Sequence, residues 1–184
     1  MSENTVVTKK EPGMAQLVII LCAISAVTAL LLGIVNMVTA PTIAKNAEEK
    51  NNKAMAAVLP ASGYTQVDYT GGDANVLAVY EAEGAGYVVQ VECPGSFGGG
   101  LQAMVGVDAS GTVTGVEIVK TAETSGLGAN AGKPAFKDQF AGLTGTAAVT
   151  KDGGTIDAIT GATITSRAVC AGVNSAIAAA ASMG

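Results

Sequence analysis

The residues best suited to chemistry lie in one segment near the carboxyl end, Asp157 to Arg167. Residues 160–166 carry four hydroxyl side chains, with the small residues Gly161 and Ala162 among them: Thr160, Thr163, Thr165 and Ser166. An alanine-rich stretch with helical character follows. The first turn of a helix offers free backbone N–H groups and the positive end of the helix dipole, which favour an anion such as phosphate. The segment therefore predicts an anion site.

A simpler interpretation of this segment stays open. A Ser or Thr N-cap accounts for one hydroxyl or two, but not for four. Arg167 lies one helical turn after Thr163 and could add positive charge. The segment is not a Walker-type phosphate loop, because the Gly-Lys-Ser/Thr ending is missing.

Two other glycine-rich stretches precede it. Residues 94–100 join two predicted strands and are typical of a flexible loop. Residues 123–128, Glu-Thr-Ser-Gly-Leu-Gly, place Leu127 between two glycines. Glycine lets a backbone approach a ligand closely, so this leucine could lie against a flat ring. A plain surface loop is the alternative.

Composition excludes several kinds of chemistry. The chain has no histidine, so Ser-His and Cys-His nucleophile pairs and histidine metal ligands are ruled out. No Cys-x-x-Cys pair occurs among Cys22, Cys93 and Cys170, and spacing alone does not show whether Cys93 and Cys170 form a disulfide. We expect no catalytic residue and no metal ligand. A net charge of −5 with a single arginine gives no footprint for nucleic acid.

An amino-terminal segment is apolar enough to cross a membrane. The chain is 49% hydrophobic and only 14% charged, and no charged residue lies between Glu11 and Lys45. We predict a short cytoplasmic tail over 1–14 and a transmembrane helix over 15–39. The apolar run is too long for a typical signal peptide, so an uncleaved anchor is expected. Basic residues flank both ends, so the charge count does not settle the orientation.

The remaining elements must position the anion site. Residues 41–60 predict a helical stalk that has Pro41 in its first turn and ends before Pro60. Residues 61–184 predict one α+β domain, with helices packed on an antiparallel sheet. Alternating patterns place strands at 76–81, 86–92, 101–107 and 112–119, and helices are expected at 133–140 and 166–181.

Two motifs resemble those of the FMN-binding domain family. Asp157-x-x-Thr160-Gly161-Ala162-Thr163 matches its Asp-x-x-Ser/Thr-Gly-Ala-Thr flavinylation motif. The loop at residues 123–128 resembles a second family segment that lies near the isoalloxazine ring, with Ser125 where the family has proline. Together with one amino-terminal membrane helix, the whole chain resembles the G subunits of Rnf-type ferredoxin:NAD⁺ oxidoreductases.

The resemblance implies a cofactor and a set of residues that hold it. A flavin transferase would join FMN, through its phosphate, to Thr163. Asp157 would serve recognition or transfer during attachment, and Arg167 is a weaker phosphate candidate. The implied cofactor-binding residues other than Thr163 are Thr160, Gly161, Ala162, Thr165, Ser166, Glu123, Thr124, Leu127 and Gly128.

The resemblance also implies partners and a place in the cell. The chain would be a single-pass inner-membrane subunit, in contact with lipid, with its flavin domain on the extracytoplasmic side. It would carry electrons within a complex of subunits A, B, C, D and E that couples ferredoxin:NAD⁺ electron transfer to movement of Na⁺ or H⁺.

Three alternatives stay open. The C subunit of a Na⁺-translocating NADH:quinone reductase is related but usually longer. A pilin-like protein would need glutamate five residues after Gly13, where the chain has Val18. An anchored extracellular binding module would not need the hydroxyl cluster.

Overall fold

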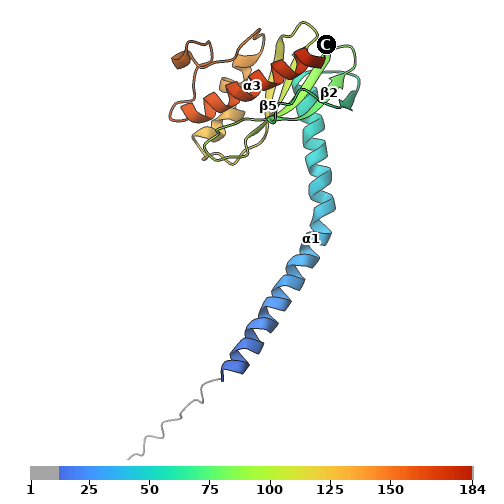
Figure 1. The fold of residues 1–184 in the computed structure, drawn as a ribbon, viewed down its shortest axis with the longest axis vertical. Helices are drawn as coiled ribbons and strands as arrows, with labels where there is room; N and C mark the ends of the chain where they lie inside the picture. Colours follow the sequence, from blue (N-terminus) through green and yellow to red (C-terminus); the bar gives the residue numbers. More distant parts are fainter. Residues whose placement is uncertain (1–12, 184) are drawn as a thin grey trace, which may run out of the picture. The chain divides into compact units, whose positions relative to one another are not determined.

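The structure is a computed structural model that describes residues 13–183 and divides into two units, with the boundary between Ala47 and Glu48. Apart from Gly13 and Met14, the predicted cytoplasmic tail lies outside the described residues. Figure 1 gives the order of the elements along the chain.

The first unit is built from helix α1, Met14–Val58, which continues into the second unit. Its most apolar 18-residue window has a mean hydropathy of 2.9 and no buried residue, so it is long and apolar enough to span a membrane. The predicted transmembrane segment 15–39 lies within it.

The prediction of a separate stalk helix beginning at Pro41 is wrong. Helix α1 runs through Pro41 without a break. A proline inside a helix removes one backbone hydrogen bond, whereas a helix end followed by a new start leaves up to four N–H and four C=O groups without helical partners. The continuous helix therefore keeps more of its backbone bonded.

The second unit contains a five-stranded antiparallel sheet in the order β1-β2-β3-β4-β5. The strands are β1 Tyr64–Val67, β2 Val76–Ala82, β3 Gly86–Glu92, β4 Gln102–Asp108 and β5 Val113–Lys120. The four predicted strands are confirmed to within one residue at each end. Strand β1 was missed because it has four residues, none of them fully buried, and lacks an alternating apolar pattern.

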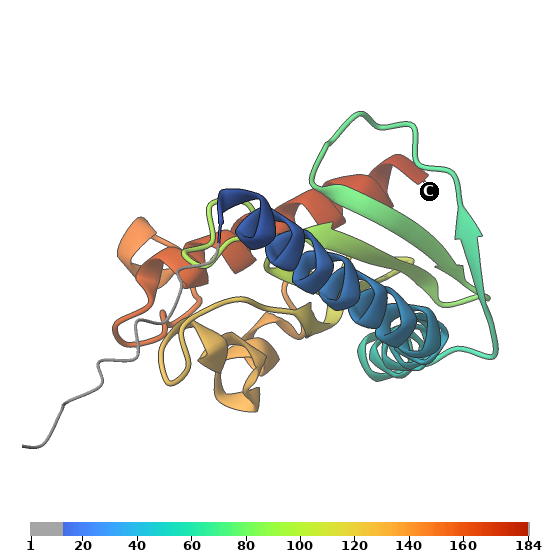
Figure 2. The ribbon, with the colours of Figure 1, turned by 90° about the horizontal axis from the view of Figure 1, so that it is seen from below.

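Helix α3, Thr163–Met183, packs on one face of the sheet against β3 and β4 (Figures 1 and 2). Val169, Val173 and Ala176 of α3 share a buried core with strand residues such as Val89 and Val105. The predicted α+β class with packed helices is confirmed, although α3 begins three residues before the predicted start.

The last turns of α1 cover a second buried cluster of the sheet. Ala54, Met55 and Val58 pack with Val88 and Met104, whose side chains alternate along their strands with those of the α3 core. Each face of the sheet therefore has its own helix, which fixes the strand ends and the loops that leave them.

Short helices follow the sheet. The predicted helix at 133–140 is α2, Pro134–Lys137, followed by the 3₁₀ turn η2, Asp138–Phe140. The 3₁₀ helices η1, Gly128–Gly132, and η3, Thr150–Asp152, lie on either side of them in the sequence. These turns carry the loops that reach the amino-terminal end of α3.

Cys93 and Cys170 are buried free thiols in the same core. The disulfide that the spacing left open is absent from this structure. Burial raises the pKa of Cys93 to about 12 and that of Cys170 to about 11, so both stay protonated at neutral pH.

Candidate functional site

A cavity of about 470 Å³ lies at the amino-terminal end of α3. Three segments that are far apart in the sequence meet there: the loop after β3, the loop after β5, and the turn that leads into α3. Eight of the ten predicted cofactor-binding residues line this cavity: Glu123, Thr124, Leu127, Gly128, Gly161, Ala162, Thr163 and Thr165. The lining also includes Phe97, Lys151 and Ile164.

Thr163 is the first residue of α3 and is half-buried at the cavity wall. The first i→i−4 bond at this end runs from the Ser166 N–H to the Ala162 carbonyl, at 3.0 Å. The N–H groups of Thr163, Ile164 and Thr165 precede that bond, so they make up the anion-favouring first turn. Ala162 precedes the helix and has no hydroxyl, so the N-cap interpretation does not explain the hydroxyl cluster.

The hydroxyls of Thr165 and Ser166 hold the segment in place. Thr165 is buried and donates to Oε2 of Glu123 at 2.7 Å. Ser166 is also buried; it donates to the Ala162 carbonyl at 3.0 Å and accepts the Ile159 N–H at 2.9 Å. Both protons are therefore used within the protein. Ser166 and the exposed Thr160 are the two predicted residues absent from the cavity lining.

Glu123 connects the three segments of the cavity. While Oε2 accepts the Thr165 hydroxyl, Oε1 accepts the N–H of Gly98 at 2.9 Å. Gly128 lies beneath this contact: a Cβ there would be 2.2 Å from Oε2 of Glu123 and 2.7 Å from Oγ1 of Thr165. Any side chain at position 128 would push the carboxylate and the hydroxyl apart, which explains the glycine.

Large apolar side chains surround Thr163 while remaining open to solvent. Phe97 is 72% exposed, Leu127 45% and Ile164 52%; among the described residues beyond α1, Leu77 is the remaining exposed large hydrophobic. Such a cluster is typical of a surface that receives a flat apolar group. Sequence reasoning missed Phe97 because its glycine-rich neighbours suggested only a flexible loop; a single aromatic side chain among those glycines was the available signal.

Leu127 also contacts the turn before α3. Gly161 has a φ of 76°, and a Cβ there would lie 3.1 Å from Cδ2 of Leu127. Glycine is favoured at this position by its left-handed backbone, and it leaves room for the leucine. The two motifs identified in the sequence are therefore in contact.

Arg167 is already paired. It donates from Nε and Nη2 to the two carboxylate oxygens of Asp152, each at 2.7 Å, in a two-point contact. This pairing lowers the pKa of Asp152 and raises that of Arg167, because each charge stabilises the other. The predicted role of Arg167 at a phosphate is thereby weakened.

Asp157 belongs to different surroundings. Its backbone N–H donates to Oε1 of Gln139 at 2.7 Å. Together with Phe136 and Ile159, Asp157 lines a separate cavity of about 290 Å³. It does not line the cavity at Thr163. This placement agrees with leaving Asp157 out of phosphate binding.

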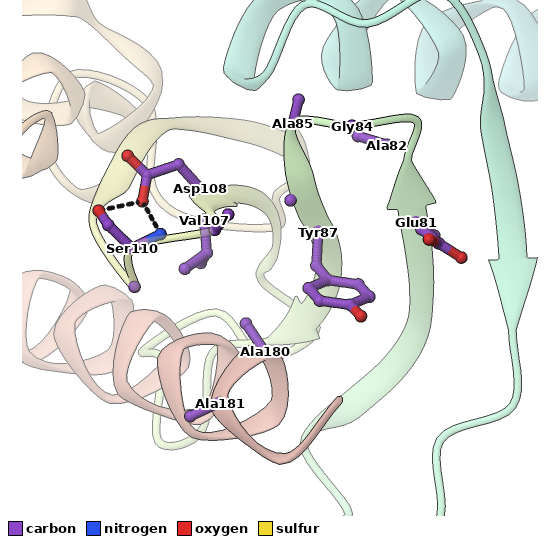
Figure 3. Close-up of a pocket in the computed structure, with 13 residues that line it drawn as sticks. Glu81, Ala82, Gly84, Ala85, Tyr87, Val107, Asp108, Ser110, Ala180 and Ala181 are labelled. Carbon is purple, nitrogen blue, oxygen red and sulfur yellow. Dashed lines mark hydrogen bonds between the residues drawn. The ribbon is translucent and has the colours of Figure 1, made fainter. Parts of the chain in front are cut away.

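A larger cavity, of about 540 Å³, lies elsewhere in the second unit (Figure 3). It is enclosed by the β2–β3 turn, the β4–β5 turn and the last turns of α3. Its lining is mostly glycine and alanine, and the Asp108 carboxylate there already accepts the N–H and the hydroxyl of Ser110, as the dashed lines show. It contains none of the predicted site residues.

Family models match both parts of the chain. A model described as "FMN-binding domain" matches residues 96–178, and one described as "RnfG N-terminal region" matches residues 12–58. The first match spans all three segments of the cavity at Thr163, and the second spans the whole of α1.

Full-length relatives carry the same type of name. The chain is 37% identical to the G subunit of a Na⁺-translocating ferredoxin:NAD⁺ oxidoreductase complex from Acetobacterium woodii, covering 86% of this chain and 87% of that protein. It is 34% identical to the G subunit of an ion-translocating oxidoreductase complex from Methanosarcina acetivorans, covering 96% of each.

A further relative is named for a different ion. The chain is 45% identical, over 50% of its length and 51% of the relative's, to the G subunit of a proton-translocating ferredoxin:NAD⁺ oxidoreductase complex from Clostridium ljungdahlii. With an FMN-binding domain match over the cavity and relatives of this name along nearly the whole chain, the protein belongs to the family of G subunits of Rnf-type ion-translocating oxidoreductase complexes.

Proposed function

We propose that the chain is the flavin-carrying subunit of an ion-translocating ferredoxin:NAD⁺ oxidoreductase complex and holds FMN covalently through Thr163. The observation that carries the proposal is the position of Thr163: a hydroxyl on the first turn of a helix, in the wall of a cavity surrounded by exposed apolar side chains.

The residues present fit FMN. The cavity volume of about 470 Å³ falls within the range of roughly 300–1,000 Å³ that is usual for small-ligand sites. The isoalloxazine ring needs an apolar surface, which Phe97, Leu127 and Ile164 offer. The phosphate needs N–H donors or positive charge, which the first turn of α3 provides. Bound FMN would supply one- and two-electron redox chemistry, while the protein supplies position and electrostatics.

Attachment uses the Thr163 side-chain oxygen. Thr163 would hold the FMN phosphate as an ester on Oγ1, with FAD as the flavin donor and with AMP and the hydroxyl proton as the groups released. Among the described residues that line the cavity, Glu123 is the only carboxylate, and it already accepts hydrogen bonds from Gly98 and Thr165. Thr163 is β-branched, which limits χ1 and so the directions that the tether can take.

The remaining predicted residues shape the cavity. Gly161 and Ala162 leave space next to the phosphate, and Thr124 and Leu127 contribute to the opposite wall. Thr165 and Ser166 act through the hydrogen bonds that hold the turn, not as phosphate donors. We assign Asp157, which does not line this cavity, to recognition by the transferase.

We assign α1 as a membrane anchor in contact with lipid, with the flavin domain on the extracytoplasmic side and subunits A, B, C, D and E as partners. Relatives that cover most of this chain are named as G subunits, which favours this assignment over the C subunit of a NADH:quinone reductase. Since the names of relatives include both Na⁺ and proton translocation, we propose Na⁺ or H⁺ as the coupling ion. A carboxyl-terminal reporter fusion tests the orientation.

The experiment that tests covalent attachment is in-gel fluorescence after denaturation. The full chain, produced with an active flavin transferase, is expected to give a fluorescent band that is lost in Thr163→Ala. Thr155→Ala is the matched control, because Thr155 is an exposed hydroxyl outside both motifs and outside the cavity, and its band should remain. A dark wild-type band, with a control substrate labelled in parallel, would overturn the proposal.

A further inference from the structure

Lys151 is the basic residue among the eleven that line the cavity at Thr163. It lies in η3, and its side chain is exposed. The other charged residue in the lining is Glu123, whose carboxylate oxygens already accept bonds from Gly98 and Thr165. The charge of Lys151 also acts on the neighbouring Asp152 carboxylate, but its side chain forms no hydrogen bond or ion pair with another described residue, so it can reach a ligand that enters the cavity.

The backbone that carries Lys151 is fixed against the helix that carries Thr163. The next residue, Asp152, makes the two-point contact with Arg167, which lies one turn along α3 from Thr163. The Thr150 N–H donates to the Ile156 carbonyl at 2.9 Å, which closes the loop around η3. Lys151 is thus held near the start of α3 by its neighbours, while its exposed side chain can turn toward the cavity.

Charge balance indicates what this lysine binds. A phosphodiester carries one negative charge, and Glu123 puts a second in the same cavity. Arg167 is committed to Asp152, so Lys151 is the cation of the described lining that can offset the added charge. We propose that Lys151 binds the phosphate of the flavin nucleotide that is joined to Thr163. This inference rests on the proposed function and extends it to a residue outside both sequence motifs.

Attachment kinetics provide the first test. With the purified full chain in detergent, an active transferase and FAD below saturation, Lys151→Gln is expected to slow the initial rate of attachment to Thr163 by about two- to fivefold. That factor corresponds to one charge pair at an exposed site. Lys151→Arg should keep the wild-type rate, and so should Lys120→Gln, which removes the same charge from an exposed position outside the cavity.

A second measurement separates phosphate binding from recognition by the transferase. In a Thr163→Ala background, the affinities for FMN and for riboflavin, which lacks the phosphate, are compared by fluorescence quenching. Lys151→Gln is expected to weaken FMN binding about two- to fivefold and to leave riboflavin binding unchanged. Where quenching is too weak to fit, equilibrium dialysis measures the affinity for FMN, which added salt should weaken in wild type but not in Lys151→Gln.

The outcomes are distinguishable. An unmodified Thr163 in wild type overturns the proposed function itself. If the wild type is labelled and FMN attachment to Lys151→Gln is equally fast, the lysine inference alone is overturned. The lysine inference is also overturned if Lys151→Gln is slow but keeps the wild-type ratio of FMN to riboflavin affinity. Where quenching is not measurable, the same holds if the variant keeps the wild-type salt dependence. In both cases Lys151 would act on the transferase and not on the phosphate.

Discussion

The hydroxyl of Thr165 donates a 2.7 Å hydrogen bond to Oε2 of Glu123, a residue 42 positions earlier in the chain. This bond joins the first turn of α3 to the loop after β5. Because the other carboxylate oxygen accepts the Gly98 N–H, one side chain holds three segments together. The loop at residues 123–128 and the start of the helix that carries Thr163 are therefore joined in one site by this contact.

Replacing Thr165 by valine should destabilise the second unit. The change keeps the shape of the side chain but leaves Oε2 of Glu123 without the donor it has in the wild type, at a cost of about 1–3 kcal/mol. Urea unfolding followed by circular dichroism measures the change. Thr124→Val, at an exposed position of the same cavity, is the control and should have little effect. Equal stability of both variants would contradict the role assigned to this bond.

Ser166→Ala should also destabilise the protein without removing the attachment oxygen. The buried hydroxyl bonds both the Ile159 N–H and the Ala162 carbonyl, so its loss leaves the half-buried Ile159 N–H unpaired, at a cost of about 1–3 kcal/mol. A thermal melt gives the stability, and in-gel fluorescence at low temperature should still show a labelled band. Loss of the label in a folded variant would instead indicate direct contact with the phosphate.

Leu127→Ala should change the environment of an attached flavin. Removing this apolar side chain admits water, which stabilises the more negatively charged reduced form and raises the midpoint potential. A spectroelectrochemical titration and the absorption spectrum measure the effect. Leu77→Ala is a matched control, since Leu77 is exposed to a similar extent, at 44%, outside this cavity. An unchanged potential and spectrum would remove Leu127 from the flavin site.

The Asp152–Arg167 pair should make stability depend on pH in acid. Arg167 holds the pKa of Asp152 below its ordinary value of 3.8. A lowered carboxyl pKa stabilises the folded state above the unfolded value, and this contribution is lost as the pH falls through the folded value. Asp152→Asn should therefore flatten the acid limb of a plot of unfolding free energy against pH. An unchanged slope would contradict this linkage.

The buried cysteines should resist alkylation. Because burial raises the pKa of Cys93 to about 12 and that of Cys170 to about 11, neither forms the reactive thiolate near pH 8. A water-soluble maleimide, followed by peptide mass spectrometry, should leave both free in the native protein and label both in urea. Labelling of either cysteine in the native protein would contradict its burial. Failure to label in urea without reductant would contradict a free thiol.

Much of this site could be predicted from local patterns. Alternation placed four strands to within a residue, and eight of the predicted cofactor-binding residues line one cavity. What could not be predicted depends on contacts between distant segments. Nothing local indicates that Asp152 takes up Arg167, that Glu123 takes up Thr165, or that Phe97 comes back to the start of α3. Helix α1 likewise continues through Pro41 because ending one helix and starting another would leave more backbone groups without partners. The presence of a proline in the sequence does not show which of these two costs is larger.

The exposed side chains of Phe97, Leu127 and Ile164 have a consequence for how such a carrier works. A flavin held on these exposed side chains, as proposed, would keep one edge of its ring open to solvent. Electrons would then reach it without a path through the interior of the domain. The rate of electron transfer would then depend on the distance from the flavin to the nearest redox centre of another protein. That distance is set by how the proteins dock in the assembly.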